Sequence, residues 1–230
     1  MKISMLGHSG FLVEGNRACL VFDLFTDEKG ILDELPIGKK DTIFFVSHAH
    51  SDHYNKKIFS LAQGGSVAYV LDSGVKPAKA ANVTLMKKGD SAEIFGALVR
   101  AFGSTDMGLS FLVEFEGKTI FHAGDLNDWY WEEESTPEEL LHDEGWFLRE
   151  IEPLQDARPD VAFLPVDARL GGHALRGPLH FARAMQPELI VPMHLAGGYN
   201  LPGELAEALQ DEKLKIEVAE LFHPGDTMQV

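Results

Sequence analysis

The stretch DTIFFVSHAHSDHYN, residues 41–55, places several metal-binding residue types directly after an apolar run. Residues 43–46 are apolar and rich in β-branched and aromatic side chains, which predicts a buried strand. The strand signal stops at Ser47. It is followed at once by four potential metal ligands: His48, His50, Asp52 and His53. So much imidazole and carboxylate at the end of a buried strand indicates a metal site.

The spacing of these ligands predicts two neighbouring metal sites served by one loop. Side chains at i and i+2 of an extended chain point the same way, so His48 and His50 can converge on one ion. Asp52 and His53 are adjacent, and the chain must turn if both are to face a second ion. Imidazole and carboxylate suit zinc, our first choice, and also manganese or iron, with one or two ions bound. The alternative is a solvated loop that carries these histidines by chance.

Two later apolar stretches also end in metal-binding residue types. KTIFHAGDLND (118–128) leads into Asp125, and ELIVPMHLAGG (188–198) leads into His194. Ligands gather at strand ends in α/β proteins. Alone, the first residue would be a turn residue and the second a capped strand end. Beside the motif at 48–53 we expect both to bind metal, with Asp125 placed to bridge two ions.

The order of secondary-structure signals predicts the fold class. Strand signals dominate the first 120 residues, and helix and strand signals alternate later. A helix start is expected near Pro137, which follows a Ser/Thr cap and precedes two glutamates. This order predicts an α/β fold of packed sheets with helices outside. Strands are expected at 11–23 (two), 41–47, 66–71, 82–86, 92–102, 109–124 (two), 160–166, 188–194 and 214–220, and helices at 54–63, 135–155, 178–186 and 202–212.

Length and charge narrow the range of functions. A chain of 230 residues that is 45% hydrophobic suffices for one domain, residues 1–230, with a full core. The net charge of −16 repels phosphodiester backbones and disfavours nucleic acid as a partner. We therefore expect a small-molecule substrate. The sequence does not decide between a monomer and a homo-oligomer.

Cysteine usage and apolar run lengths point to a cytoplasmic protein. The single cysteine, Cys19, excludes an internal disulfide and a thiolate-rich zinc site. The apolar runs are shorter than the roughly 20 residues that a membrane helix needs, so no membrane partner is expected. The first residues have the pattern of a strand and lack that of a signal peptide.

Three short motifs resemble, in sequence and in order, the metallo-β-lactamase superfamily of hydrolases: HAHSDH at 48–53, AGD at 123–125 and PMH at 192–194. MLGHSGFLVE at 5–14, followed by LVFD at 20–23, is similar to the branch that includes ascorbate-6-phosphate lactonase-like proteins. The resemblance covers nearly the whole chain. It implies an αββα four-layer sandwich, with two mixed β-sheets face to face, helices on both outer faces and metals at one edge. It also implies metal-assisted hydrolysis.

One departure from the family pattern concerns the middle of the chain. The family usually supplies a further His ligand between the first motif and the Gly-Asp pair. Here VRAFGSTDMGLSF, residues 99–111, occupies that place, and no His lies between His53 and His122. The first site would then be weak, use Asp106, borrow a distant His, or stay empty. The second site would be complete with Asp52, His53, Asp125 and His194, and we expect it to be better occupied.

Several residues around this centre have open roles. The resemblance places His8 near the metals as a support or substrate contact, and the alternative is a turn residue. Asp23, at a strand end, is expected to orient a metal-binding His or to be an ordinary strand-end carboxylate. His122, within a strand, is expected to be a buried, hydrogen-bonded side chain. Trp129 and Trp131 either form a wall of the pocket or pack in a helix.

A glycine-rich stretch, residues 164–180, carries positive charge in an otherwise acidic chain. Arg169, His173 and Arg176 are predicted to bind an anionic substrate, because arginine presents a planar fork to phosphate or carboxylate. The alternative is ordinary surface arginine. Asp106 is a further candidate for a substrate contact.

These observations predict a metal-dependent hydrolase. Asp52 would hold a metal and orient the attacking water or accept its proton, and the substrate would be a small anionic ester, lactone or phosphoester. A metal lowers the pKa of bound water toward neutrality. The alternative is a non-catalytic ligand-binding or regulatory protein on the same fold, which the absent middle His would favour.

Overall fold

A computed structural model describes residues 1–34, 40–61, 66–77 and 79–230. Within these residues the strands form two seven-stranded sheets. Each sheet contains parallel and antiparallel pairs, so both are mixed, as predicted. The first sheet consists of β14 (Thr227–Gln229), β1 (Lys2–Gly7), β2 (Gly10–Glu14), β3 (Ala18–Phe22), β4 (Asp41–Val46), β5 (Val67–Asp72) and β6 (Val83–Met86), in that order. The second consists of β13 (Glu217–Val218), β12 (Leu189–Met193), β11 (Val161–Pro165), β10 (Lys118–His122), β9 (Ser110–Phe115), β8 (Ala97–Phe102) and β7 (Ser91–Ile94).

The central strand β4 is covered on both faces. Ile43 and Phe45 belong to the core between the sheets, while Phe44 and Val46 belong to a second apolar cluster on the outer face. A strand buried on both faces has an uninterrupted apolar sequence rather than an alternating one. This explains the apolar run that precedes the histidines.

Phenylalanine rings join the two sheets. The ring of Phe11 on β2 lies 4.7 Å from that of Phe163 on β11, and Phe45 on β4 lies 5.5 Å from Phe111 on β9. These four side chains are 0–1% exposed. Burying each stabilises the fold by roughly 1.5–3 kcal/mol relative to exposure. The rigid interface fixes the strand ends that carry the site.

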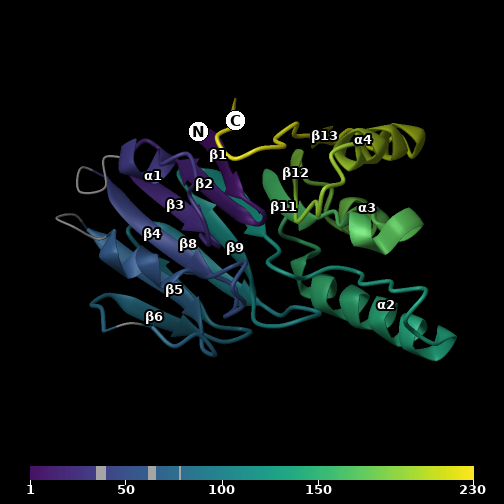
Figure 1. Ribbon diagram of the computed structural model, residues 1–230, viewed down its shortest axis with the longest axis horizontal. Coiled ribbons are helices and arrows are strands. Elements are labelled where there is room, and N and C mark those ends of the chain that lie inside the picture. Colours follow the sequence, from purple (N-terminus) through teal and green to yellow (C-terminus); the bar gives the residue numbers. More distant parts are fainter. Residues whose placement is uncertain (35–39, 62–65, 78) are drawn as a thin grey trace.

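Three helices cover the outer face of the second sheet: α2 (Pro137–Ile151), α3 (Arg176–Met185) and α4 (Leu201–Asp211) (Figure 1). Phe181 of α3 stacks on Phe121 of β10, with ring centroids 4.9 Å apart. The predicted start of α2 is confirmed: Thr136 accepts a hydrogen bond from the Glu139 amide, and the Glu139 carboxylate accepts one from the Thr136 amide.

The outer face of the first sheet carries shorter helices. These are α1 (Ile31–Glu34) and the 3₁₀ helix η1 (Lys56–Ser60), which contribute Leu32 and Ile58 to the outer apolar cluster. The predicted helix over 54–63 is therefore a 3₁₀ helix, and its residues 62 and 63 lie outside the described part of the chain. Helices on both outer faces complete the predicted αββα arrangement.

Two expected strands differ from the structure. Residues 92–102 were expected as one strand, but they lie in β7 and β8, which form a hairpin. Phe95 and Gly96 turn the chain there with φ of 49° and 77°. The strand expected over 214–220 is limited to β13, residues 217–218.

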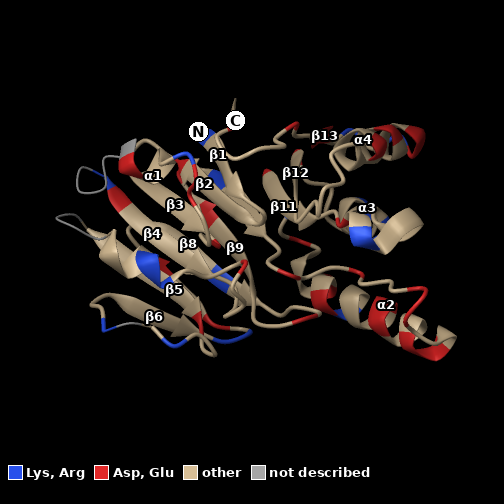
Figure 2. Ribbon diagram, in the orientation of Figure 1, with Lys and Arg blue, Asp and Glu red and all other residues tan. Residues whose placement is uncertain are grey.

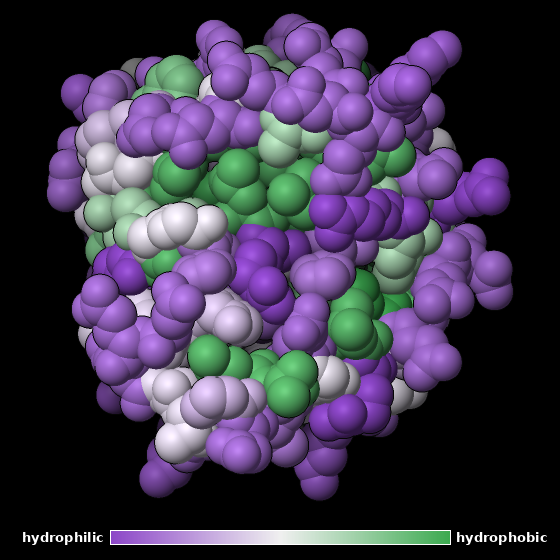
Figure 3. Space-filling model, turned by 90° about the vertical axis from the view of Figure 1, so that its right-hand side faces the viewer, coloured by the Kyte–Doolittle hydropathy of each residue, from purple (hydrophilic) through white to green (hydrophobic). Residues whose placement is uncertain are grey.

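The molecular surface is mostly hydrophilic and acidic. Acidic side chains predominate on α2 and α4 (Figure 2). The helix-covered side shows separate hydrophobic patches within a largely hydrophilic surface (Figure 3). Among the described residues, no helix has both the length and the apolar character to cross a membrane.

Candidate metal centre

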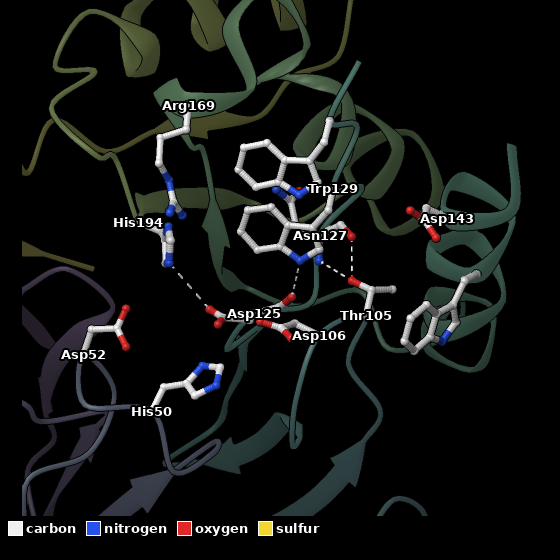
Figure 4. A pocket seen from close by; sticks show the side chains of 12 residues that line it. His50, Asp52, Thr105, Asp106, Asp125, Asn127, Trp129, Asp143, Arg169 and His194 are labelled. Atoms are coloured by element: carbon white, nitrogen blue, oxygen red, sulfur yellow. Dashed lines mark hydrogen bonds and ion pairs between the residues drawn. The ribbon is translucent and has the colours of Figure 1, made fainter. Parts of the chain in front are cut away.

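The predicted metal ligands lie close together. Four of them, His50, Asp52, Asp125 and His194, line one cavity (Figure 4). His48 and His53 follow β4, Asp125 follows β10, and His194 follows β12. Gly108 and Gly124, with φ of 75° and 55°, allow the neighbouring loops to approach Ser47 closely. A Cβ atom at position 108 would lie 2.0 Å from the Ser47 carbonyl oxygen, so no other residue fits without movement.

Asp125 lies between two groups of histidines. Its Oδ2 atom is 3.2 Å from His48 Nε2, and its Oδ1 atom is 3.0 Å from His53 Nε2 and 3.8 Å from His194 Nε2. Each carboxylate oxygen therefore faces a different set of imidazoles. Asp125 is thus placed to contribute to an ion on either side, and His48, His53 and Asp125 also offer ligand atoms within 4.8 Å of one another.

The first group, called here the His48 group, consists of His48, His50 and Asp106. His48 Nε2 lies 3.0 Å from His50 Nδ1. His50, Asp106 and Asp125 offer ligand atoms that all lie within 4.8 Å of one another. Asp106, from the stretch in which the sequence has no His, is thus within ligand distance of His50 and Asp125, so its use as a ligand remains a prediction that this geometry allows.

The second group, called here the His194 group, consists of His8, Asp52, His53 and His194, whose ligand atoms also lie within 4.8 Å of one another. His8 Nε2 lies 3.4 Å from Asp52 Oδ2. The sequence suggested His8 only as a support or substrate contact, and its position adds a candidate ligand. His8 lies in the tight turn between β1 and β2 with φ of 50°, and its carbonyl accepts a hydrogen bond from the His194 amide.

Hydrogen bonds fix the tautomers of three histidines. His53 Nδ1 donates to Asp23 Oδ2 at 2.8 Å, and His194 Nδ1 donates to Asp167 Oδ2 at 2.8 Å. Ser47 Oγ donates to Asp23, so it accepts from His48 Nδ1 at 2.9 Å. In the neutral rings of His53 and His194 the Nε2 lone pair then points away from the carboxylate and suits a metal, whereas His48 Nε2 also contacts His50 Nδ1.

Asp167 was missed in the sequence, whereas Asp23 was considered. Both follow an apolar strand, in the stretches LVFD and LPVD. The second stretch gave the same signal as the first, and its meaning becomes visible only when His194 is known to lie beside it. His122, as predicted, is buried and donates Nε2–H to the Ser9 carbonyl at 2.9 Å.

The buried polar atoms of the centre fit a bound cation. His53 Nε2 and Asp125 Oδ1 are not aligned for a hydrogen bond, and both are buried without a hydrogen-bond partner among the described residues, as is His8 Nε2. Burial alone would raise the pKa of Asp125, but His48 and His53 hold it well below its usual range. A metal ion would satisfy these atoms together, so the residues fit a metal.

Two histidine pKa values move in opposite directions. Burial lowers the pKa of His53, but its contacts with Asp125 and Asp23 outweigh this and raise it to about 10. Burial and the neighbouring His194 and His53 lower the pKa of His8 to about 4. Without a metal, His8 is therefore neutral at pH 7 and His53 is protonated, so an ion bound by His53 would displace its Nε2 proton.

A cavity of about 420 Å³ opens in front of the centre. This volume suits a small molecule. Figure 4 shows Arg169 and His194 on one side of it, Asp125 at its base and Asp143 of α2 on the opposite side. The cavity is lined by His50, Asp52, Thr105, Asp106, Asp125, Asn127, Trp129, Trp131, Asp143, Trp146, Arg169 and His194.

The three residues predicted to bind an anion lie in different places. Arg169 reaches the cavity, and its side chain is 56% exposed. Arg176 instead donates to the buried Asp128 at 2.9 Å and lies over the ring of Tyr130. His173 pairs with Glu132 at 2.9 Å. All three are paired with a carboxylate, Arg169 with Asp167, and of the three only Arg169 lines the cavity.

Comparisons with known proteins identify the family. A family model described as a β-lactamase superfamily domain matches residues 2–194. The chain is 27% identical over 244 residues to a metal-dependent hydrolase of Korarchaeum cryptofilum and 27% identical over 250 residues to one of Thermococcus kodakarensis. Both alignments cover all of both proteins.

Solved structures share the fold. A metallo hydrolase of Ignicoccus hospitalis superposes with a TM-score of 0.68 at 21% identity, covering 99% of this chain and 97% of that chain. A diiron β-hydroxylase of Streptomyces venezuelae gives a TM-score of 0.69 at 12% identity, covering 100% and 54%.

Proposed function

Because this chain belongs to the metallo-β-lactamase superfamily and is a metal-dependent hydrolase, we propose that its substrate is a small anionic ester, lactone or phosphoester. The observation that carries this proposal is the position of Arg169. It is the one cationic side chain among the residues that line the cavity in the described chain, apart from histidines. A metal centre at the base and a cation at the rim suit a substrate with a reactive carbonyl or phosphoryl group and a separate negative charge.

We propose zinc as the metal, held by the His48 group, the His194 group and the bridging Asp125. The carboxylate of Asp106 also suits manganese or iron, because carboxylate oxygen is a good ligand for these ions. Such a metal, when bound, lowers the pKa of a water ligand toward neutrality and polarises the oxygen under attack.

The protein's own residues position the reactants. Asp52 has a half-exposed side chain at the cavity, so it can orient the attacking water and accept its proton. Asp23 and Asp167 keep the imidazoles of His53 and His194 in one orientation. Each of these three carboxylates therefore has a separate task.

Arg169 is held ready for an anion. Its Nε atom donates to both oxygens of Asp167 at 3.0 Å, and Nη2 also donates to Asp167. Asp167 is itself fixed by His194. The guanidinium is thus oriented before substrate arrives, and Nη1 remains available for a ligand.

The test is the variant Arg169→Ala on a panel of esters, lactones and phosphoesters, each with an anionic and a neutral analogue. We expect KM for the anionic analogue to rise about tenfold, with kcat and metal content little changed, because a contact made equally in the ground and transition states is lost. Arg100→Ala, which removes an arginine paired with Glu114 on the β8–β9 face, is the control. Equal kinetics for Arg169→Ala and the native protein would contradict the proposal.

The alternative of a non-catalytic binding protein has lost its main support. It depended on the absent middle His, and the proximity of Asp106 to His50 and Asp125 supports the proposal that a carboxylate serves instead.

A further inference from the structure

The chain has three tryptophans, and all three line the cavity at the metal centre. Trp129 and Trp131 belong to the segment after β10, and Trp146 belongs to α2. Each is partly buried, so each leaves part of its ring surface open. Neither metal binding nor anion binding needs this much aromatic surface.

Trp129 and Trp131 stack on each other and together form one wall of the cavity. Their ring planes are parallel within 1°, and their centroids are 5.9 Å apart. This is offset stacking, and it leaves no room for another ring between the two indoles. A ligand must therefore lie against the outside of the wall, in the cavity.

The wall links the metal centre to the anion-binding arginine. Trp129 Nε1 donates to the Asp125 carbonyl at 2.9 Å, and its ring meets His194 edge-on at 5.7 Å. The guanidinium carbon of Arg169 lies over the ring of Trp131, 5.6 Å from its centroid, and covers part of that ring face, so a ligand would meet Trp131 beside the guanidinium. A group resting on this wall is thus beside both the metal ligands and Arg169.

The remaining tryptophan is also fixed by the protein. Trp146 Nε1 donates to Glu150 Oε1 at 3.2 Å, and Glu150 is paired with Lys88. Because the N–H groups of Trp129 and Trp146 are already bonded, these side chains offer a ligand ring faces rather than hydrogen bonds. Flat apolar faces bind flat apolar groups.

We infer that Trp129, Trp131 and Trp146 form a subsite for an aromatic ring of the substrate, which makes the substrate an aryl ester or aryl phosphoester. The anionic substituent faces Arg169, because Asp143 on the opposite side of the cavity would repel it. The identification as an ester rests on the proposed function, whereas binding of the ring does not.

Tryptophan fluorescence tests the subsite directly, because in this chain it reports only on this cavity. The probes are phenylphosphonate and methylphosphonate, whose C–P bonds are not cleaved by ester hydrolysis, added to the full-length metal-loaded protein. We expect phenylphosphonate to change the emission and to bind about tenfold more tightly than methylphosphonate. Equal affinities, or no binding of either probe, would overturn the inference.

Tryptophan variants test which side chains contact the ring of phenylphosphonate. Trp131→Ala and Trp146→Ala should each weaken phenylphosphonate binding by about fivefold to tenfold and leave methylphosphonate binding unchanged, while Trp131→Phe should retain most of the affinity. Phe95→Ala, which removes an exposed aromatic ring at the β7–β8 turn, is the control. Unchanged phenylphosphonate binding in both alanine variants, with metal content retained, would mean that the tryptophans only shield the centre.

Turnover separates failure of this inference from failure of the proposed function. If aliphatic and aryl esters are hydrolysed with equal kcat/KM, the subsite is wrong and the hydrolase stands. If no ester, lactone or phosphoester is hydrolysed but phenylphosphonate binding still depends on Trp131, the ring subsite stands and the proposed substrate class is wrong.

Discussion

The two ligand groups on either side of Asp125 are held in different ways. In the His194 group, His53 and His194 each donate a hydrogen bond to a buried carboxylate, Asp23 and Asp167. In the His48 group, His48 donates only to the hydroxyl of Ser47. His50 and Asp106, the other members of that group, are solvent-exposed.

This difference predicts unequal metal affinities. A carboxylate behind a histidine fixes the ring and raises its basicity, and such partners typically change metal affinity by 10–100-fold. Exposed side chains lose conformational freedom when they bind, which weakens the complex. We therefore expect one ion to be held tightly by the His194 group and a second to be held loosely by the His48 group.

Asp125→Asn should have the largest effect on metal binding and activity, because Asp125 is the one ligand that both groups share. We expect loss of both ions and a fall in kcat/KM on the order of a thousandfold, since neither oxygen charge remains to bridge the groups. Metal analysis together with ester hydrolysis measures this. Asp160→Asn, which removes a carboxylate paired with Lys118 at the far end of β10, is the control. Retention of either ion at native affinity would show that Asp125 is not a bridge.

The ligands of the His48 and His194 groups were largely predictable from the sequence. His48, His50, Asp52 and His53 lie in one short motif after a strand, and their meeting follows from strand geometry. Asp125 and His194 were predictable because each ends an apolar run. The αββα architecture came from the resemblance of these motifs to a known family.

Other contacts were not predictable, because they join residues far apart in the sequence. Asp167 lies 27 positions from His194, and His8 meets Asp52 only because β1 and β4 belong to the same sheet. The charge of Arg176 suggested substrate binding, and its hydrogen bond to Asp128, 48 positions away, could not be read from the sequence. Whether a charge is free or paired depends on tertiary structure.

Asp167→Asn tests whether the buried carboxylate causes the difference between the groups. We expect affinity for the tightly held ion to fall by about 10–100-fold, because an amide stabilises the His194 orientation less than a carboxylate does. Arg169→Ala is the matched control, since it removes the other partner of Asp167 and leaves the carboxylate in place. Competition with a chelator measures both affinities. Equal losses in the two variants would attribute the effect to the loop as a whole.

Asp106→His should have the smallest effect and should act on the loosely held ion alone. A third imidazole in the His48 group would raise its affinity for zinc by about tenfold, or about 1.4 kcal/mol. Isothermal titration with zinc measures both ions in one experiment. A change in the affinity of the tightly held ion would mean that Asp106 does not belong to the His48 group.

The most direct test is the metal content of the native protein after long dialysis, compared with that of His194→Ala and His48→Ala. We expect about one equivalent of transition metal per chain in the native protein and in His48→Ala, and close to none in His194→Ala. Far-ultraviolet circular dichroism confirms that each variant is folded. Two equally retained ions in the native protein, or an ion kept by His194→Ala and lost by His48→Ala, would contradict the account.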